Sequence, residues 1–387
     1  MLLRRLTLSN FRNFEDLDVR LGPRLTVVHG DNGQGKSNLL EAIYLLAIGK
    51  SYRSQTEREL VRWDAQASGL GLVAGSVEHA AGDTELRVGL DLRGGGGLQK
   101  RVRVNGVAKR TSGLLGLLNA VLFSADDIEL VYGSPQGRRR YLDVLLSQTS
   151  AHYLHALQRY QRVLAQRNHL LRSLREGRAG EDELAFWDGE LCREGAAVLA
   201  PRLEATALLG PLIAEAYERF AADGGGLEIE YTATVPVSDA GTPDALAAAM
   251  AAAIEASRRQ ERASAQTLVG PHRDDLRLVQ HGVELGRHAS RGQARLAALS
   301  LRLAEAHLLW VRRGEPPVLL LDDILSELDV ARREMVMREV AAYPQALLTT
   351  ADLGIVPEAA RVQARVLRVD GASLLEETPG LSPPILI

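Results

Sequence analysis

The sequence GDNGQGKS at residues 30–37 has the composition and spacing of a loop that binds nucleotide phosphates. It fits the pattern G-x-x-x-x-G-K-[ST] in full, and it stands between an apolar strand pattern and an apolar helix pattern, as this mechanism requires. Backbone amides would surround the phosphates, Lys36 would reach the β and γ oxygens, and Ser37 would bind Mg²⁺. The predicted ATP-binding residues are Gly30, Asp31, Asn32, Gly33, Gln34, Gly35, Lys36, Ser37 and Asn38.

Lysine usage supports a specific role for Lys36. The chain contains only four lysines, at positions 36, 50, 100 and 109, against 42 arginines. Because the chain otherwise prefers arginine, the compact ammonium at position 36 indicates a requirement for lysine there. The alternative is a glycine-rich surface turn that matches by accident, and the flanking strand and helix patterns disfavour it.

Two carboxylates follow an all-apolar stretch in VLLLDD, residues 318–323. A buried strand that ends in this way can hold one acid near Mg²⁺ and the second near an attacking water. We predict that Asp322 binds the metal together with Ser37, and that Asp323 is the base or orients the water. Lys36, Asp322 and Asp323 are therefore the predicted catalytic residues. An acid that merely caps a following helix is the alternative, and the phosphate loop makes the metal role the better one.

The segment ASRGQARLAALSLRLAEA, residues 289–306, opens a long apolar-striped helix. Ser290 and Gly292 precede the stripe, and the free amides and positive dipole of such a helix start attract an anion. We expect this anion to be a phosphate supplied from elsewhere. The alternative is an ordinary capped helix in which Ser290 bonds its own backbone.

The surrounding patterns predict an α/β protein. Residues 2–21 alternate like strands, residues 24–30 form a short apolar strand, and residues 37–49 form a helix. Between residues 68 and 110, apolar and polar residues alternate in several segments, which predicts an antiparallel sheet. A hairpin is expected at Asn105-Gly106, and the chain should reverse direction again at GGGG, residues 94–97.

From about Leu114 the periodicity becomes helical. One apolar stripe has heptad-like spacing, with Tyr153, Leu157, Tyr160, Leu164, Leu171 and Leu174. Thr242-Pro243 should cap a later helix. Strand patterns return at residues 276–285, 318–323 and 346–352. The tail LSPPILI should be poorly ordered.

Bulk composition predicts a folded, cytoplasmic protein. The formal net charge is −3, there is one cysteine, Cys192, and Met1 is followed by no apolar stretch with a cleavage signal. The sequence has no run of about 18 apolar residues, so no membrane partner is expected. Residues 136–178, however, contain nine arginines against Asp143 and Glu176, which favours phosphate contact over a merely solvated face. Within this basic segment, the predicted DNA-binding residues are Arg138, Arg139, Arg159 and Arg162.

The order of the motifs resembles that of an ABC-type ATPase: phosphate loop, signature, acidic strand end and D-loop. The resemblance implies that Ser290, Arg291, Gly292 and Gln293 form a signature that closes over the γ-phosphate held by a second subunit. It also implies a D-loop with Ser326 and Asp329 in SELD, and a γ-phosphate sensor at Thr350 or Asp352, of which we choose Thr350. The Q-loop is expected near residues 123–126. Asp323 stands where most such ATPases carry Glu, which agrees with slow turnover.

A longer set of segments resembles the bacterial RecF family: NFRNFEDL, GKSYRS, FSADDIELVYGSPQGRRRYLD, LVGPHRDDL and LLLDDILSELDVARR, together with the phosphate loop and the signature. The resemblance implies an SMC-like ABC-type ATPase head with an inserted helical lobe and no long coiled coil. It implies ATP and Mg²⁺ as cofactors, an ATP-dependent homodimer on duplex or gapped DNA, slow DNA-dependent hydrolysis, and action with RecR and RecO in loading RecA. Arg53 resembles a DNA-sensing arginine; a solvated surface arginine is equally compatible.

We expect the ATPase head at residues 1–113 and 265–387, with its antiparallel β-subdomain, and the helical lobe at residues 114–264. Two other classes of protein share parts of the motif order. A transporter nucleotide-binding subunit would lack the basic helical segment, and a scaffold that binds ATP without turnover would release no phosphate. A nucleotide kinase is disfavoured because it needs no signature turn.

Overall fold

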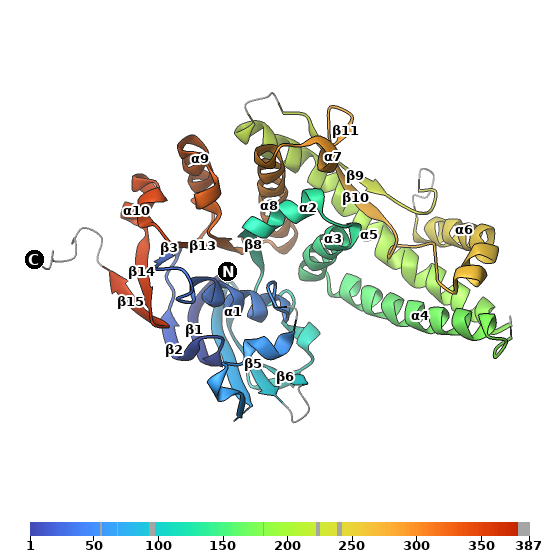
Figure 1. Ribbon diagram of the computed structural model, residues 1–387, viewed down its shortest axis with the longest axis horizontal. Coiled ribbons are helices and arrows are strands. Elements are labelled where there is room, and N and C mark those ends of the chain that lie inside the picture. Colours follow the sequence, from blue (N-terminus) through green and yellow to red (C-terminus); the bar gives the residue numbers. More distant parts are fainter. Residues whose placement is uncertain are drawn as a thin grey trace, which may run out of the picture. The chain divides into compact units, whose positions relative to one another are not determined.

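The computed structural model describes residues 1–54, 56–67, 69–92, 97–180, 182–221, 225–237 and 242–377. These residues form two compact units, shown in Figure 1. Unit 1 comprises Met1–Asp126 and Glu305–Ile387, and unit 2 comprises Asp127–Ala304. The predicted reversal at residues 94–97 falls largely outside the described residues, and the predicted disorder of residues 381–387 falls wholly outside them.

An antiparallel sheet in unit 1 has the strand order β2-β1-β4-β5-β6-β7. Its strands are β1 (Leu2–Phe11), β2 (Phe14–Arg20), β4 (Leu70–His79), β5 (Gly82–Leu92), β6 (Leu98–Val104) and β7 (Val107–Lys109). Asn105 and Gly106 both have positive φ, 49° and 78°, as a two-residue hairpin requires. The predicted antiparallel sheet and this hairpin are therefore confirmed.

A second sheet in unit 1 has the order β15-β14-β3-β13-β12-β8. It contains β3 (Arg24–His29), β8 (Ala120–Ser124), β12 (Val318–Asp322), β13 (Gln345–Thr350), β14 (Arg365–Asp370) and β15 (Ser373–Glu377). All neighbours are parallel except β14 and β15. Strand β12 is apolar up to its last residue, and every residue of β13 is buried, which is typical of a parallel sheet covered on both faces.

Helix α1 (Lys36–Ile48) packs against strands of both sheets in unit 1. It is buried almost all round, as expected for a helix whose apolar residues do not form a single stripe. Gly49, with φ 76°, ends the helix in the left-handed conformation. Helices α9 (Val330–Val340) and α10 (Glu358–Gln363) complete this unit.

Unit 2 is mainly helical. Its helices are α2 (Glu129–Tyr132), α3 (Pro135–Thr149), α4 (Ala151–Arg175), α5 (Asp182–Phe220), α6 (Pro243–Ser264) and α7 (Leu285–His288). A small antiparallel sheet joins β9 (Leu227–Thr232), β10 (Asp275–Gln280) and β11 (Val283–Glu284). Helix α8 (Arg291–Arg313) begins in unit 2 and ends in unit 1. Thr242 accepts a hydrogen bond from Ala245 N, so the predicted cap of α6 is confirmed.

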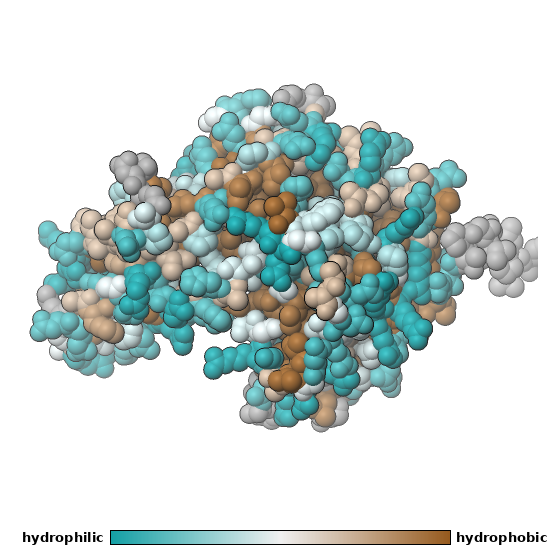
Figure 2. All heavy atoms as spheres, turned by 180° about the vertical axis from the view of Figure 1, so that it is seen from behind, coloured by the Kyte–Doolittle hydropathy of each residue, from teal (hydrophilic) through white to brown (hydrophobic). Residues whose placement is uncertain are grey.

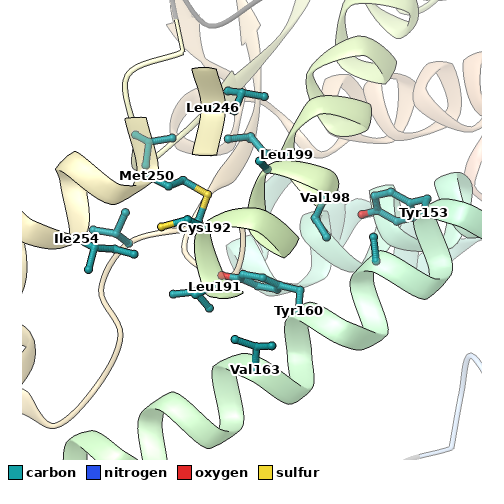
Figure 3. Packing of buried hydrophobic residues seen from close by; sticks show 14 of the residues in the cluster. Tyr153, Tyr160, Val163, Leu191, Cys192, Val198, Leu199, Leu246, Met250 and Ile254 are labelled. Carbon is teal, nitrogen blue, oxygen red and sulfur yellow. The ribbon is translucent and has the colours of Figure 1, made fainter. Parts of the chain in front are cut away.

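The main core of unit 2 lies between α4, α5 and α6, as Figure 3 shows. Tyr153, Tyr160 and Val163 of α4 face Leu191, Val198 and Leu199 of α5, and Met250 and Ile254 come from α6. The predicted stripe thus marks the buried side of α4.

Helix α5 is long and apolar enough to cross a membrane, judged by length and composition. Its buried residues instead pack within unit 2 against α4, α6 and β9. A soluble core helix passes the same test of composition. Figure 2 shows a face on which hydrophilic residues predominate and hydrophobic residues gather in small groups.

The two compact units divide after Asp126 and after Ala304, whereas the sequence patterns suggested residues 113 and 264. Strand pairing accounts for the difference. Strand β8 pairs with β12 in the parallel sheet, and β10 pairs with β9 beside α5. Strand β8 therefore belongs to unit 1 with β12, although helical sequence surrounds it. Strand β10 belongs to unit 2 with β9.

Candidate functional site

The carboxyl ends of the parallel strands bring the predicted site residues of unit 1 together. Thr350 of β13 lies opposite His29 of β3, directly before the phosphate loop. Asp322 of β12 lies opposite Thr349 on one side and Ser124 of β8 on the other. Ligands of parallel α/β sheets bind at this edge. The region expected to hold the Q-loop, residues 123–126, begins at the same edge.

The phosphate loop has the backbone conformation that its glycines permit. Gly30, Gly33 and Gly35 have φ values of 147°, 83° and 111°. A Cβ at Gly35 would lie 2.4 Å from the Asn13 amide nitrogen, and the φ of 111° would strain any other residue there. Asn13 in turn donates to Gln34 O over 2.7 Å, which holds the loop against the end of β1.

The Lys36 ammonium lies inside this loop and donates to Gly30 O at 2.6 Å and to Asp31 O at 2.9 Å. Burial lowers its pKa, while the carboxylates of Asp323, Asp31 and Asp322 act in the opposite direction. A partly desolvated cation curled within a glycine loop is well suited to bind an anion.

Asp322 is held by three hydroxyl groups. Its Oδ1 accepts from Ser37 Oγ at 2.7 Å and from Thr349 Oγ1 at 2.8 Å, and its Oδ2 accepts from Tyr52 OH at 2.9 Å. The predicted pair of Ser37 and Asp322 is therefore in direct contact. Its oxygens are the ligand type that Mg²⁺ prefers.

Asp323 has φ 51° and ψ 29°, a left-handed conformation that is uncommon for a residue other than glycine. Its backbone N donates to Thr349 O at 3.2 Å. Burial raises the pKa of the Asp323 carboxyl, whereas Ser326 and Lys36 lower it. Backbone strain together with a raised pKa is typical of a group that handles protons.

The described residues contain no group of three or more His, Cys, Asp or Glu side chains that could hold a metal by themselves. Ser37 and Asp322 provide only two oxygen ligands. This donor set fits Mg²⁺, which proteins usually bind through one or two side chains with the remaining ligands from phosphate and water.

An open groove with a volume of about 670 Å³ lies beside the phosphate loop. Its lining includes Asn13 and Asn38, together with Trp63, which is 84% exposed. An exposed indole offers a flat face on which a planar ring can stack. Sequence patterns did not identify this groove, because its lining comes from separate segments.

The signature turn, residues 290–293, belongs to unit 2 and is solvent-exposed apart from Gln293, which is partly exposed. Ser290 Oγ accepts from Gln293 N at 3.2 Å, while Gln293 Oε1 accepts from Ser290 N at 2.9 Å. This reciprocal pair is a capping box for α8. Arg291 and Gly292 follow at the exposed start of the helix. The hydrogen bond between Ser290 and its own helix start, expected for an ordinary capped helix, is thus present. The turn remains exposed to solvent.

The predicted D-loop residues have local partners within unit 1. Ser326 Oγ donates to Asp323 O at 2.7 Å, and Asp329 caps α9 by accepting from Arg332 N at 2.9 Å. The predicted sensor Thr350 is fully buried, and its hydroxyl donates to Asp352 O at 3.0 Å. The neighbouring Thr349, rather than Thr350, contacts Asp322.

The chain matches the family described as RecF/RecN/SMC N terminal domain over residues 2–372. It is 43% identical to the DNA replication and repair protein RecF of Chloroflexus aurantiacus over 91% of this chain and 94% of that protein. It is 38% identical to the RecF protein of Halalkalibacterium halodurans over 97% of this chain and 99% of that protein. The chain belongs to the RecF family of DNA replication and repair proteins.

Solved structures agree with this RecF assignment. The chain superposes on a structure described as the recombination mediator protein RecF-ATP in the RecFOR pathway with a TM-score of 0.88, 30% identity and 97% coverage of each chain. An Smc head domain from Pyrococcus furiosus gives a TM-score of 0.55 at 14% identity, which supports the fold alone. The predicted fold, an SMC-like ABC-type ATPase head with a helical lobe and no long coiled coil, is confirmed.

Two of the arginines predicted to bind DNA are engaged within unit 2. Arg138 is buried and forms a bidentate pair with Asp275, with distances of 2.8 and 2.9 Å. Arg139 donates to Asp274 O at 2.6 Å. Burial lowers the pKa of Arg139. Because its guanidinium is committed to Asp275, Arg138 is not available to a phosphate, and we withdraw it from the DNA-binding set.

The other predicted arginines are more accessible. Arg162 is exposed on α4 and donates to Gln158 O at 3.3 Å, whereas Arg159 is half-exposed and pairs with Glu194 at 2.8 Å. Arg53 is exposed in unit 1, where it donates to Asn38 Oδ1 at 3.1 Å. The count of arginines in residues 136–178 therefore overstated the basic surface, because it takes no account of the carboxylates that pair with Arg138 and Arg159.

Sequence reasoning missed Asn13, Tyr52 and Thr349. Asn13 and Tyr52 occur within NFRNF and GKSYRS, which carried the family resemblance without any assigned role. Thr349 immediately precedes the residue chosen as the sensor. Their contacts with the phosphate loop or with Asp322 depend on strand register and on chain segments far apart in sequence.

Proposed function

We propose that this chain is an ATP-dependent, DNA-binding recombination mediator of the RecF type. Two copies join when ATP and Mg²⁺ are bound, and the signature turn of each copy covers the phosphates held by the other. Weak, DNA-dependent hydrolysis of ATP to ADP and phosphate releases the pair. In the cytoplasm the protein acts with RecR and RecO on gapped or duplex DNA and assists RecA loading.

The observation that carries this proposal is the contact between Ser37 and Asp322 beside the buried Lys36 ammonium. Lys36 would bind the terminal phosphates, and Ser37 with Asp322 would bind the metal. Bound Mg²⁺ neutralises phosphate charge and acts as a Lewis acid. Asp323 would orient a water or accept its proton, because its carboxyl lies next to Asp322 at the same strand end.

The groove beside the phosphate loop supports binding of a whole nucleoside triphosphate. Trp63 would stack on the base, and Asn13, which bonds Gln34 of the phosphate loop, lines the same groove. The match to a structure described as RecF-ATP agrees with this assignment.

Helix α4 supports binding to the DNA backbone. Its 25 residues include no acid, and Arg162, Arg172 and Arg175 are exposed. Exposed arginines contact phosphates without reading bases, so affinity should depend on salt rather than on sequence. We propose Arg53, Arg139 and Arg159 as additional contacts, since each keeps part of its side chain accessible.

Sedimentation of the full chain with gapped duplex DNA tests this function. ATP and Mg²⁺ should produce a dimer that sediments with DNA, whereas ADP or no nucleotide should leave mainly monomer. A monomer under all three conditions would contradict the proposal. Phosphate release that increases with DNA would exclude the non-hydrolysing scaffold, and DNA binding would separate this chain from a transporter subunit.

A further inference from the structure

Helix α2 packs against α7, the short helix that precedes the signature turn, and both helices and the turn belong to unit 2. The two backbones approach closely, because a Cβ at Gly286 of α7 would lie 2.6 Å from Val131 O of α2. A side chain at position 286 would therefore push the two helices apart. The buried side chains of Leu130 and Val131 hold α2 in the interior of the unit, and Leu285 of α7 is buried as well.

Tyr132, the last residue of α2, contacts the start of the signature turn. Its hydroxyl donates to Ala289 O at 2.7 Å, and Ala289 is the residue directly before Ser290. The capping box between Ser290 and Gln293 joins residues of the turn to each other. The Tyr132 bond, in contrast, joins the turn to a different helix, so it can set where the turn lies.

Both ends of α2 are held within unit 2 by buried charged groups. Asp127, two residues before α2, is buried and accepts from Arg302 of α8 at 2.6 Å. Gly133 O, directly after α2, accepts at 2.7 Å from Arg138, which is itself buried and paired with Asp275. Hydrogen bonds to ionised groups are stronger than those between neutral groups. Helix α2 is therefore a fixed support for the phenol at its end.

We propose that Tyr132 is a positioning residue of the signature turn, and that it contributes to the ATP site of the second copy and not to the site of its own chain. The proposal rests on the proposed function, because it assumes that the turn covers phosphates held by a second copy. A turn that is already in place loses less conformational entropy when the two copies meet. Removal of the phenol hydroxyl should therefore weaken ATP-driven dimerisation without changing ATP binding by the monomer.

The test places Tyr132→Phe in one or the other chain of a mixed dimer formed by Lys36→Met and Ser290→Arg. In that dimer the one intact site takes its phosphate loop from the Ser290→Arg chain and its signature from the Lys36→Met chain. Tyr132→Phe in the Lys36→Met chain should raise the dimer dissociation constant roughly three- to tenfold, as expected for the loss of one hydrogen bond. The same substitution in the Ser290→Arg chain should leave the constant unchanged, because the signature of that chain is already blocked.

Sedimentation of each mixture over a range of protein concentrations, with ATP and Mg²⁺ and without DNA, measures the dissociation constant. The two placements are matched controls for each other, since a general loss of stability would weaken both mixtures alike. Tyr132 is 40% exposed, so Tyr132→Phe should leave the fold intact, and denaturation of each chain checks this.

Equal dissociation constants for the two placements, or a larger effect in the Ser290→Arg chain, would overturn the inference and leave the proposed function intact. Failure of the mixture that lacks Tyr132→Phe to form a dimer would instead overturn the proposed function and, with it, the inference.

Discussion

Ser37 Oγ and Asp322 Oδ1 are joined by a hydrogen bond of 2.7 Å, although 285 residues separate them in the chain. Thr349, opposite Asp322 in the next strand, donates to the same oxygen. The serine of the phosphate loop and the acid from β12 therefore form one preformed unit. Because the two groups are already in place, nucleotide binding should leave the head of a single copy largely unchanged. Its cost in conformational entropy should then be small.

Asp323→Asn should separate nucleotide binding from hydrolysis. The amide keeps the size of the side chain but cannot accept the proton of an attacking water, and Asp322 remains to bind the metal. We expect ATP affinity close to wild type, phosphate release reduced at least tenfold, and a longer-lived dimer. Equilibrium ATP binding and phosphate release measure the two steps. Wild-type turnover by Asp323→Asn would assign the base to another residue.

Arg167→Met should destabilise unit 2. Arg167 is fully buried and bonds Asp188 at 2.7 Å, Glu261 at 2.6 Å and Thr267 at 2.8 Å. Methionine fills similar space but leaves the buried Glu261 carboxylate without its cation, which costs about 3–5 kcal/mol. Chemical denaturation measures this change in stability. Arg162→Met, which replaces an exposed arginine of the same helix, is the control and should change stability by less than about 0.5 kcal/mol.

His272 should make the stability of unit 2 depend on pH. Its Nδ1 lies 2.6 Å from Tyr160 OH and its Nε2 lies 3.1 Å from Thr267 O, an arrangement that suits the neutral ring. Burial lowers the pKa of His272 from 6.5 to about 4. Between these values the unfolded chain binds more protons, so the contribution of His272 to stability is full above pH 6.5 and falls as the pH approaches 4.

The variant His272→Gln isolates this effect, since glutamine can hydrogen-bond both partners without titrating. Between pH 6.5 and pH 4, the stability of the wild type should fall by about 3 kcal/mol more than that of His272→Gln, measured by denaturation at each pH. Parallel stability curves for the two proteins would show that the imidazole is not the group that titrates.

Local sequence patterns predicted the parts of the site that local chemistry defines. The phosphate loop needs glycines at positive φ, and the hairpin at Asn105-Gly106 needs a two-residue turn, so both leave a signature within a few residues. The acids Asp322 and Asp323 were found because an apolar strand ends at them. Such signals lie within one element and do not depend on tertiary contacts.

The features that sequence analysis missed depend on partners far away in the chain. Arg138 counted as surface charge until Asp275, 137 residues later, proved to be its partner. Arg167 lies among the positions of an apolar stripe, where a charge is tolerated only because α5 and α6 supply carboxylates. Tyr52 and Asp322 are 270 residues apart. Charge counts and periodicity carry no information about such pairs.

Replacing Arg162, Arg172 and Arg175 together by Glu should weaken duplex DNA binding equally for all sequences. The salt dependence should also flatten, by roughly 0.9 in the slope of log affinity against log salt for each phosphate that is no longer neutralised. ATP-driven dimerisation without DNA should stay intact. A second triple variant provides a control with the same change in charge. It replaces by Glu three other exposed arginines of unit 2, Arg219, Arg259 and Arg277. Equal weakening in both triple variants would indicate a general charge effect instead of an α4 surface.

The central claim is that each ATP site is completed by the signature turn of a second copy, and mixing two inactive variants tests it most directly. Lys36→Met removes the ammonium of the phosphate loop, and Ser290→Arg places a bulky side chain on the exposed turn of unit 2. Alone, each variant should fail to dimerise with ATP, although Ser290→Arg should still bind ATP as a monomer. Mixed, the two should form dimers with one intact site, built from the phosphate loop of one copy and the signature of the other. Sedimentation of the mixture with ATP should therefore recover a dimer, whereas no recovery, or weakened ATP binding by monomeric Ser290→Arg, would contradict a site shared between two copies.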